Sequence, residues 1–244
     1  MVRVLALVLA WSVAASAAEL KVLSVGAVQP SLGEVAERFK KETGHNITIQ
    51  VDTAPGLTKR LASGESADIL IAPPNLVEEA AKSGKAAAST KMLMARVGIG
   101  IAARKDLKLN IRTVDALRQA LINADAIVYN EGSSGQYLEK LFDQMGIGER
   151  LKSKTKRYPN GGQVGQHILD GKGNEIGFLP IPYIKANEAR GLQYVAPMPG
   201  ETQNHTEYEA VVMTGGKSAA VAQEFIRYMT SPAAKQIFAA AGVE

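Results

Sequence analysis

The sequence predicts an α/β protein built as two lobes. Short runs of β-branched residues alternate with amphipathic helical patterns along the chain, and no internal repeat interrupts them. Hydrophobic residues make up 46% of the chain, and there is no cysteine. Alternating strands and helices form mostly parallel sheets covered by helices. A chain without cysteine has no disulfides or thiolate metal sites, so an aliphatic core must stabilise it.

The N-terminus has the pattern of a secretory signal. A short positive segment, residues 1–3, precedes an apolar run over 4–14, and the small residues Ala15, Ser16 and Ala17 follow. The alternative, a membrane anchor, needs a run of roughly 20 apolar residues, and this run is shorter. We therefore predict a signal peptide over residues 1–18, cleaved after Ala17 or Ala18, and export to the periplasm.

The first half of the chain contains three predicted strands and three predicted helices. The first helix begins at the capping box formed by Ser31 and Glu34 and ends at Gly44. Alternating or β-branched runs indicate the strands, and apolar positions with helical spacing indicate the helices. In chain order these are a strand at 22–25, a helix at 31–43, a strand at 46–51, a helix at 57–63, a strand at 68–72 and a helix at 76–83.

The second half continues the alternation and ends in helices. The strand at 97–102 contains glycines that leave few side chains to pack, which predicts a close backbone approach or a bend. Pro232 separates the last two helices. The predicted elements are strands at 97–102, 126–129, 175–179 and 208–213, and helices at 113–124, 136–145, 163–169, 218–230 and 232–241.

This order divides the chain into two lobes. We predict that lobe 1 contains residues 19–96 and 205–244, because the last segment is too short and too helical to fold alone. Lobe 2 then contains residues 97–204. The chain crosses twice between the lobes, which predicts a two-strand hinge that opens and closes.

The familiar enzyme motifs are missing. The three histidines, His45, His167 and His205, do not have metal-binding spacing, and no nucleophile elbow or phosphate-binding loop is complete. The net charge of +4 is dispersed, which gives no support to nucleic-acid binding. We therefore predict a protein that is not an enzyme, with no cofactor or metal, and a monomer. A periplasmic phosphatase or esterase is the enzymatic alternative.

Small residues precede several predicted helices, where free backbone N–H groups bind anions. The segment Gly132-Ser133-Ser134-Gly135-Gln136 follows a strand and opens a helix. Three other strand-to-helix joints have the same character, at 26–29, 53–58 and 160–163. Carboxyl ends of strands gather at one edge of an open sheet, so the four joints can converge on one cleft. The alternative is that they are ordinary helix caps.

One arginine lies where the chain passes between the lobes. Arg96 can clamp a carboxylate with two hydrogen bonds, or it can belong to a surface ion pair.

The order of these features resembles the periplasmic molybdate-binding protein family and, more broadly, the type II periplasmic binding proteins of ABC importers. The matching segments are VLSVGAVQPSLGEVAERFKKETG, LTKRLASGESADILIAPP, VYNEGSSGQYLEKLFDQMGI and GNEIGFLPI, which span most of the chain after the signal. The resemblance implies a two-lobe fold, a hinge, and delivery of solute to a membrane permease.

The ligand-binding positions implied by the resemblance differ from the family pattern. Ala27 and the segment around Pro55 replace serines, Pro180 replaces a tyrosine, and Ser134 matches the expected serine. Each lost donor costs about 1–3 kcal/mol of binding free energy. The candidate binding residues are Ala27, Val28, Gln29, Pro55, Gly56, Arg96, Ser133, Ser134, Gly135, Gln163, Val164 and Pro180.

These departures favour a small organic carboxylate over a bare oxyanion. We expect a solute-binding protein of an ABC importer that closes on this anion. The alternatives are molybdate or tungstate binding, and presentation of the ligand to a sensor rather than a transporter.

Overall fold

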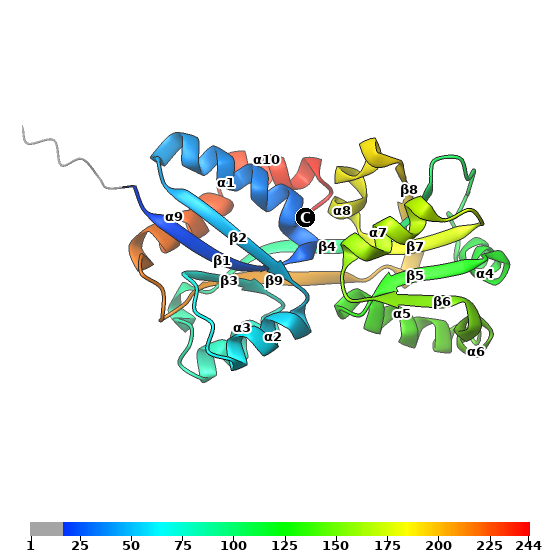
Figure 1. Cartoon of the computed structure of the whole chain (residues 1–244), viewed down its shortest axis with the longest axis horizontal. Coiled ribbons are helices and arrows are strands. Elements are labelled where there is room, and N and C mark those ends of the chain that lie inside the picture. Colours follow the sequence, from blue (N-terminus) through cyan, green and yellow to red (C-terminus); the bar gives the residue numbers. More distant parts are fainter. Residues whose placement is uncertain (1–16) are drawn as a thin grey trace, which may run out of the picture.

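The computed structural model describes residues 17–244, which form two α/β halves joined at a narrow waist (Figure 1). All but two residues of the predicted signal peptide lie outside the described residues. Within residues 17–244, no helix combines the length and the apolar character needed to span a membrane.

The described elements alternate along the chain as expected. The strands are β1 (Glu19–Val25), β2 (Asn46–Asp52), β3 (Ile69–Ala72), β4 (Met92–Arg104), β5 (Ala126–Asn130), β6 (Thr155–Tyr158), β7 (Glu175–Pro180), β8 (Leu192–Pro197) and β9 (His205–Val212). The α-helices are α1 (Gln29–Thr43), α2 (Ala54–Ala62), α3 (Pro74–Lys82), α4 (Val114–Asn123), α5 (Ser133–Gln144), α6 (Gly148–Leu151), α7 (Gly161–Asp170), α8 (Ile181–Ala186), α9 (Ala219–Met229) and α10 (Pro232–Ala240). The short 3-10 helix η1 (Gly26–Val28) leads into α1.

One mixed sheet runs through both halves. Its order is β2-β1-β3-β9-β4-β7-β5-β6, and β8 also pairs with β4. The strands β1, β2 and β3 are parallel to one another, as are β5, β6 and β7, while β9 and β4 introduce the antiparallel pairs. The predicted mixed α/β class is confirmed, although the two lobes share a single curled sheet rather than having one each.

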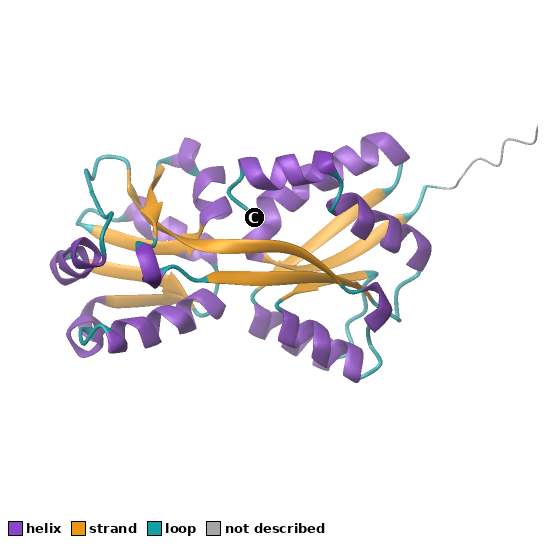
Figure 2. Ribbon diagram, turned by 180° about the vertical axis from the view of Figure 1, so that it is seen from behind, coloured by secondary structure: helices purple, strands orange, loops and turns teal. Residues whose placement is uncertain are grey.

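Two long strands make the crossing between the halves, and Figure 2 shows them passing from one to the other. The N-terminal part of β4 pairs with β9 up to Gly98 and His205, and from Ile99 onward β4 pairs with β7. The change of partner therefore falls two residues from the predicted lobe boundary at 96/97. A Cβ atom on Gly100 would lie 2.7 Å from the Ile184 side chain of α8, so the predicted close approach at the glycine-rich strand is confirmed.

The end of the chain adds a further pairing at this crossing. The backbone N–H of Arg96 donates to the carbonyl of Glu244 at 2.7 Å, and the N–H of Glu244 donates back at 2.9 Å. The preceding helices α9 and α10 pack on α1, where the Phe39 ring lies 5.0 Å from Phe225 and 5.1 Å from Tyr228. The C-terminal helices thus pack against the first half of the chain.

Separate hydrophobic cores fill the two halves. One cluster contains residues from 20–97 and 208–243, and two others lie within 99–198. The division between the clusters falls at the crossing strand, between Val97 and Ile99.

Hydrogen bonds from the turn between α2 and β3 hold the C-terminal segment against lobe 1. The Asp68 carboxylate is 5% exposed and accepts backbone N–H donors from Lys21, Lys217 and Ser218 at 2.8, 2.7 and 3.1 Å. The Ser66 hydroxyl donates to the carbonyl of Gly215 at 2.7 Å. This carboxylate, which is 150 residues from Ser218 in sequence, therefore joins the first strand to the C-terminal segment.

Several predicted helix starts are wrong by two or three residues. The helices α1, α2, α5 and α7 begin at residues 29, 54, 133 and 161, rather than at 31, 57, 136 and 163. Ser31 is not the cap of α1, because Val28 holds that position and Ser31 is buried in the first turn. The short elements β6, β8, α6 and α8 were not predicted, because their runs of four to six residues contain little periodic pattern.

Candidate functional site

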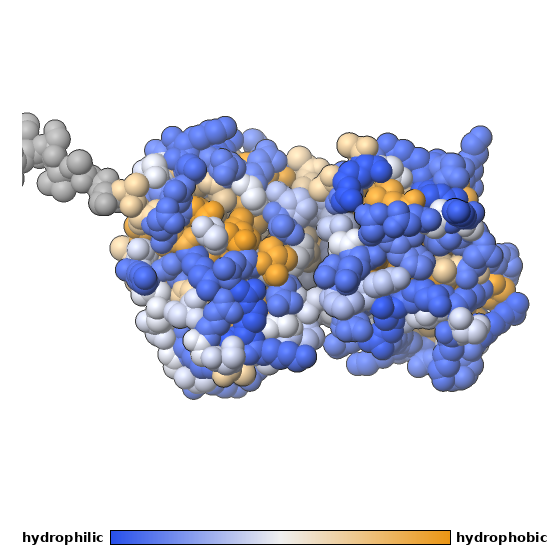
Figure 3. Space-filling view, viewed as in Figure 1, coloured by the Kyte–Doolittle hydropathy of each residue, from blue (hydrophilic) through white to orange (hydrophobic). Residues whose placement is uncertain are grey.

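A cavity of about 370 Å³ lies between the two halves, at the waist seen in the space-filling view (Figure 3). Its volume is at the lower end of the range for pockets that bind small molecules. The lining residues come from both lobes and are Val25, Gly26, Ala27, Gln29, Val51, Asp52, Thr53, Ala54, Asn130, Gly132, Ser133, Ser134, Asn160, Gly161, Gly162, Pro180, Tyr183 and Tyr208.

The N-termini of four α-helices, α1, α2, α5 and α7, meet at this cavity. Lining residues belong to the segment η1–α1 and to the first turn of α2 in lobe 1, and to the first turns of α5 and α7 in lobe 2. The first backbone N–H groups of a helix lack partners within it, and each helix carries roughly half a positive charge at this end. The cavity therefore presents hydrogen-bond donors and positive potential from opposite sides.

The start of α5 is held against the end of β5 by close packing. The Asn130 side chain accepts the N–H of Gly132 through Oδ1 at 2.7 Å. A Cβ atom on Gly135 would lie 1.7 Å from the Asn130 carbonyl oxygen, so only glycine allows this approach. As a result, Ser133 and Ser134 are placed at the cavity with their hydroxyls and the first free N–H groups of α5.

The start of α7 contacts an aromatic ring from α8. Asn160 caps α7 by accepting the N–H of Gln163 through Oδ1 at 3.0 Å. A Cβ atom on Gly165 would lie 3.2 Å from the ring of Tyr183. Glycine at this position thus lets Tyr183 pack over the first turns of α7 and reach the cavity.

The start of α2 carries the one formal charge among the lining residues. Thr53 caps α2 by accepting the N–H of Gly56 through Oγ1 at 3.3 Å. Asp52, the last residue of β2, accepts the N–H of Thr53 through Oδ1 at 2.7 Å. Within the described chain, no lysine, arginine or histidine lines the cavity.

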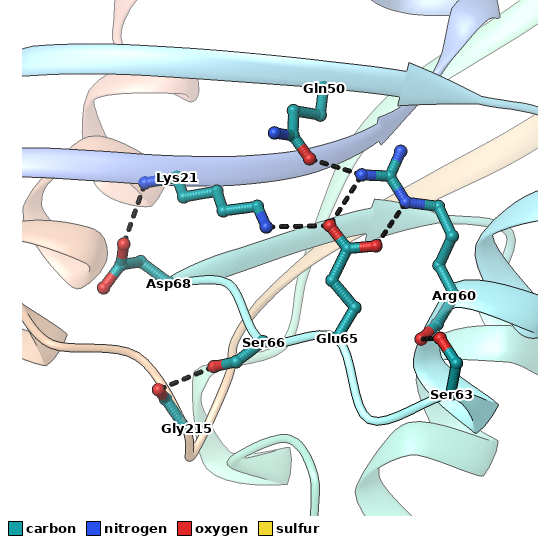
Figure 4. A network of polar contacts seen from close by, with 8 residues as sticks. All are labelled: Lys21, Gln50, Arg60, Ser63, Glu65, Ser66, Asp68 and Gly215. Atoms are coloured by element: carbon teal, nitrogen blue, oxygen red, sulfur yellow. Dashed lines mark hydrogen bonds and ion pairs between the residues drawn. The ribbon is translucent and has the colours of Figure 1, made fainter.

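The far end of α2 is anchored by the polar network in Figure 4. The Glu65 carboxylate accepts hydrogen bonds from Arg60 Nε at 2.6 Å and from Lys21 Nζ at 2.7 Å. These hydrogen bonds, Arg60 first and Lys21 second, lower the pKa of Glu65 to about 2. Arg60 also donates to the Gln50 side chain of β2. The network ties α2 to β1 and β2, which fixes the direction in which its N-terminus faces the cavity.

Two tyrosines, Tyr183 and Tyr208, are among the lining residues. Burial raises the pKa of Tyr208 to about 12, and burial also raises the pKa of Tyr183. Both phenols are therefore neutral at physiological pH and can donate a hydrogen bond without adding charge. The site as a whole offers uncharged donors, together with a single carboxylate.

The structure brings five of the twelve predicted binding residues to the cavity. These are Ala27, Gln29, Ser133, Ser134 and Pro180. Six more are within two residues of a lining residue along the chain: Val28, Pro55, Gly56, Gly135, Gln163 and Val164. Val28 and Val164 are fully buried in the cores of lobes 1 and 2. The binding role of these eleven residues remains a prediction.

Arg96 lies on the opposite face of the crossing strand from the cavity. Its guanidinium reaches Glu207 at 3.6 Å and Glu244 at 3.9 Å, and its side chain is 48% exposed. The neighbouring residue Ala95 pairs with Tyr208, which does line the cavity. Because successive side chains of a strand point to opposite faces, Arg96 must point away. The structure thus corrects its placement to a surface ion pair, the alternative that the sequence left open.

Sequence reasoning did not identify several lining residues. Thr53, Ala54 and residues 160–162 belong to the four joints but are not among the predicted binding residues, because the sequence predicts later helix starts. Asp52 ends a predicted strand and lies just before such a joint, so its position was the available signal. Tyr183 and Tyr208 had no motif that singled them out.

The donor set does not suggest a resident metal. Among residues 17–244, no three His, Cys, Asp or Glu residues gather closely enough to hold a metal ion. The single carboxylate of the cavity has no second ligand beside it, and the remaining groups are those that bind an anion.

Comparison with known proteins places this architecture among extracellular binding proteins. Residues 20–244 match the family described as bacterial extracellular solute-binding protein. A protein from Pseudomonas sp. named aconitate isomerase is 28% identical over 226 residues, covering 89% of this chain and 85% of the relative. The molybdate-binding protein ModA of Azotobacter vinelandii is 21% identical over 234 residues, covering 94% of this chain and 91% of that protein.

Solved structures agree with the fold. The periplasmic molybdate-binding protein of Azotobacter vinelandii superposes with a TM-score of 0.77 at 18% identity, covering 92% of this chain and 98% of that structure. The sequence-based resemblance to a divergent member of the molybdate-binding-protein-like family is thereby confirmed.

The prediction that this chain is not an enzyme does not stand. It is contradicted by the relative named aconitate isomerase, which matches 89% of the chain. The prediction relied on missing metal ligands, a missing nucleophile and missing paired carboxylates. An isomerisation that only moves a proton requires none of these groups, so their absence does not exclude this class of enzyme.

Proposed function

The chain belongs to the bacterial extracellular solute-binding protein family, and we propose that it binds a small polycarboxylate between its lobes and isomerises it there. The observation that carries the proposal is the convergence of four helix N-termini on one cavity without a cationic side chain. Such a site favours anions through backbone amides and hydroxyls. The relative named aconitate isomerase makes aconitate, a propene with three carboxylates, the first candidate substrate.

The layout of the donors supports a polycarboxylate rather than a compact oxyanion. The donors are spread over two helix starts from each lobe, and the cavity has about 370 Å³ to fill. A molecule with several separated carboxylates can occupy several helix starts at once. A single tetrahedral ion needs its donors gathered around one centre, and Ala27 and Ala54 offer no hydroxyl for that purpose.

A second candidate function is delivery of the bound anion to a membrane permease. Family membership favours it, as does the double crossing of β4 and β9, which suits closure of the lobes around a ligand. The family description also supports export. N-terminal sequencing of the mature protein, recovered from outside the cytoplasm, should begin at Ala18 or Glu19.

Calorimetry against a panel of anions tests the binding proposal. The panel contains cis-aconitate, trans-aconitate, tricarballylate, citrate, molybdate, tungstate and sulfate. We expect micromolar or tighter binding of at least one tricarboxylate and weaker binding of the three inorganic ions. Tight molybdate or tungstate binding without any response to the carboxylates would contradict the proposal.

Proton NMR tests the catalytic part of the proposal. The vinyl proton of cis-aconitate has a different chemical shift from that of trans-aconitate, so either isomer can be followed as it converts. We expect both starting isomers to reach the same mixture at a rate proportional to protein concentration. Binding without conversion would support the delivery function and contradict the isomerase.

A further inference from the structure

Asp52 is an unusual residue for a cavity that attracts anions. It is the one lining residue with a formal negative charge, and it lies at the carboxyl end of β2, beside the positive end of α2. A carboxylate repels an anionic ligand, which lowers affinity. Its presence therefore needs an account, either in the local structure or in the chemistry of the site.

The local structure uses only part of this carboxylate. Oδ1 accepts the N–H of Thr53, but Thr53 itself caps α2 through Oγ1. Within the described chain, Oδ2 accepts no hydrogen bond. Arg60, the cation of α2, directs its ion pair at Glu65 rather than at Asp52. Oδ2 is thus without a hydrogen-bond donor among the described residues, at a residue that lines the cavity, although the carboxylate also packs against Gly56, where an added Cβ atom would lie 2.6 Å from Oδ2.

The other lining groups are poor proton acceptors. The tyrosines Tyr183 and Tyr208 are neutral phenols, and the remaining side chains are amides, hydroxyls, prolines and aliphatic groups. Amides and hydroxyls are far weaker bases than a carboxylate in water-accessible sites. By this comparison, Asp52 is the only lining side chain suited to take a proton from a bound molecule.

We propose that Asp52 is the catalytic base that moves a proton between the two outer carbons of an unsaturated tricarboxylate held in this cavity. The inference rests on the proposed function. Asp52 Oδ2 removes a proton from the methylene carbon, and the electron pair of that C–H bond becomes shared over three carbons. The double bond then lies on the former methylene side, and the protonated Oδ2, which can exchange its proton with solvent, returns a proton to the former vinyl carbon.

This transfer balances without a second reactant. One C–H bond breaks, one C–H bond forms, and the carboxylate of Asp52 is regenerated. The new double bond takes its geometry from the conformation about the former single bond, which the cavity fixes. A cis isomer therefore leaves as trans when the bound carboxylates are held in the trans arrangement, and the reverse reaction uses the same steps.

The helix N-termini stabilise the charge that develops during this step. Removing the proton adds a negative charge to a molecule that already carries three, and the charge spreads onto the carboxylates. Preorganised N–H donors, such as those of Ser133, Ser134 and Gly161, favour this state more than the ground state. The same donors thus serve both capture and proton transfer.

Asp52→Asn tests the assignment, because the amide oxygen can still accept the N–H of Thr53 while the basic oxygen is lost. General base catalysis contributes about 100- to 10,000-fold to a rate, so we expect conversion of aconitate to fall by at least about 100-fold. Binding of tricarballylate, a saturated analogue that cannot isomerise, should be unchanged or tighter by calorimetry. Asp52→Glu should retain part of the rate, because the carboxylate remains but shifts position.

A second readout follows the proton itself. In D₂O, the wild-type protein should catalyse the incorporation of deuterium at the methylene carbon of aconitate, and the Asp52→Asn variant should not. The matched control is Asp115→Asn, which removes an exposed carboxylate from the first turn of α4, away from the cavity. It should leave conversion, exchange and tricarballylate binding unchanged.

The outcomes separate the two proposals. Wild-type rates retained within threefold in a folded Asp52→Asn protein would overturn the role of Asp52 while leaving the isomerase intact. Wild-type binding without conversion or exchange would overturn both catalysis and the role of Asp52, and would leave binding intact. No binding of any tricarboxylate would overturn the proposed function itself.

Discussion

Gly135 offers the sharpest test of how the cavity is built. Its missing side chain lets α5 start directly against the end of β5. An added Cβ atom would lie 1.7 Å from the backbone carbonyl oxygen of Asn130, half the 3.4 Å at which ordinary van der Waals contact begins. The neighbouring atom is backbone and cannot rotate away. Gly135→Ala must therefore displace the start of α5.

The size of the effect follows from two opposing terms. Alanine in a helix is favoured over glycine by about 1 kcal/mol. Overpacking of a filled interior costs about 1–3 kcal/mol, and a contact with fixed backbone belongs at the upper end. We expect Gly135→Ala to lower the free energy of unfolding by about 2 kcal/mol.

The same displacement should weaken ligand binding. Ser133 and Ser134 precede Gly135 and carry the donors of α5 into the cavity. Loss of one good hydrogen bond to an anion costs about 1.5 kcal/mol or more. An affinity loss of at least about tenfold is therefore expected for any anion that the site binds.

Gly33→Ala is the matched control, because it makes the same change in α1 with no atom within 4 Å of the new Cβ. It should raise the free energy of unfolding by about 0.5–1 kcal/mol and leave affinity unchanged. Urea unfolding measures the first quantity and calorimetry the second. If both variants changed stability in the same direction, the reasoning from the close approach of α5 would be refuted.

Three further predictions concern other parts of the molecule. Ser133→Ala combined with Ser134→Ala should weaken anion binding at least about tenfold by calorimetry with little change in melting temperature, since no cap hydrogen bond is lost. Asp68→Ala should lower the free energy of unfolding by about 3 kcal/mol in urea titrations, because three backbone N–H donors lose a charged acceptor. The pKa of Glu65 is about 2 in the folded protein against an ordinary 4.5, so its contribution to the free energy of unfolding is complete above pH 4.5 and is lost as the pH falls toward 2. Glu65→Gln should therefore reduce the loss of stability between pH 4.5 and 2 by about 1 kcal/mol, because the network is partly exposed; urea unfolding at several pH values measures this.

Much of this fold could be predicted from the alternation of patterns. Strands with β-branched runs and helices with a clear apolar stripe were located within a few residues, because burial imposes those periods. Short elements such as β6 and α8 could not be predicted, because four to six residues contain too little periodic pattern. The mixed class and the return of the C-terminus followed from order alone.

The candidate site was predicted in outline but displaced in detail. All four joints line one cavity, yet Pro55, Gly135 and Gln163 each stand one residue past a lining residue. Small and polar residues at a joint fit either a loop or the first helical turn, and the local pattern does not separate them.

The contribution of a residue to the cavity could not be predicted where it depends on strand pairing. Tyr208 reaches the cavity because β9 crosses beside β4, and that pairing joins residues more than 100 positions apart. Arg96 lies on the same pair of strands, but its position in the alternation turns it outward. The register of one strand pair thus decides which of two neighbouring positions faces the ligand.

The continuous strand β4 also connects the two lobes without a break in the strand. Since β4 runs unbroken through both lobes, any closure of the lobes around a ligand would change the twist of this one strand pair, and twist varies between sheets. The backbone pairing of Arg96 with Glu244 widens this strand pair on one side and stiffens it. The affinity measured for any ligand therefore includes the work of twisting β4, and residues far from the cavity can tune it.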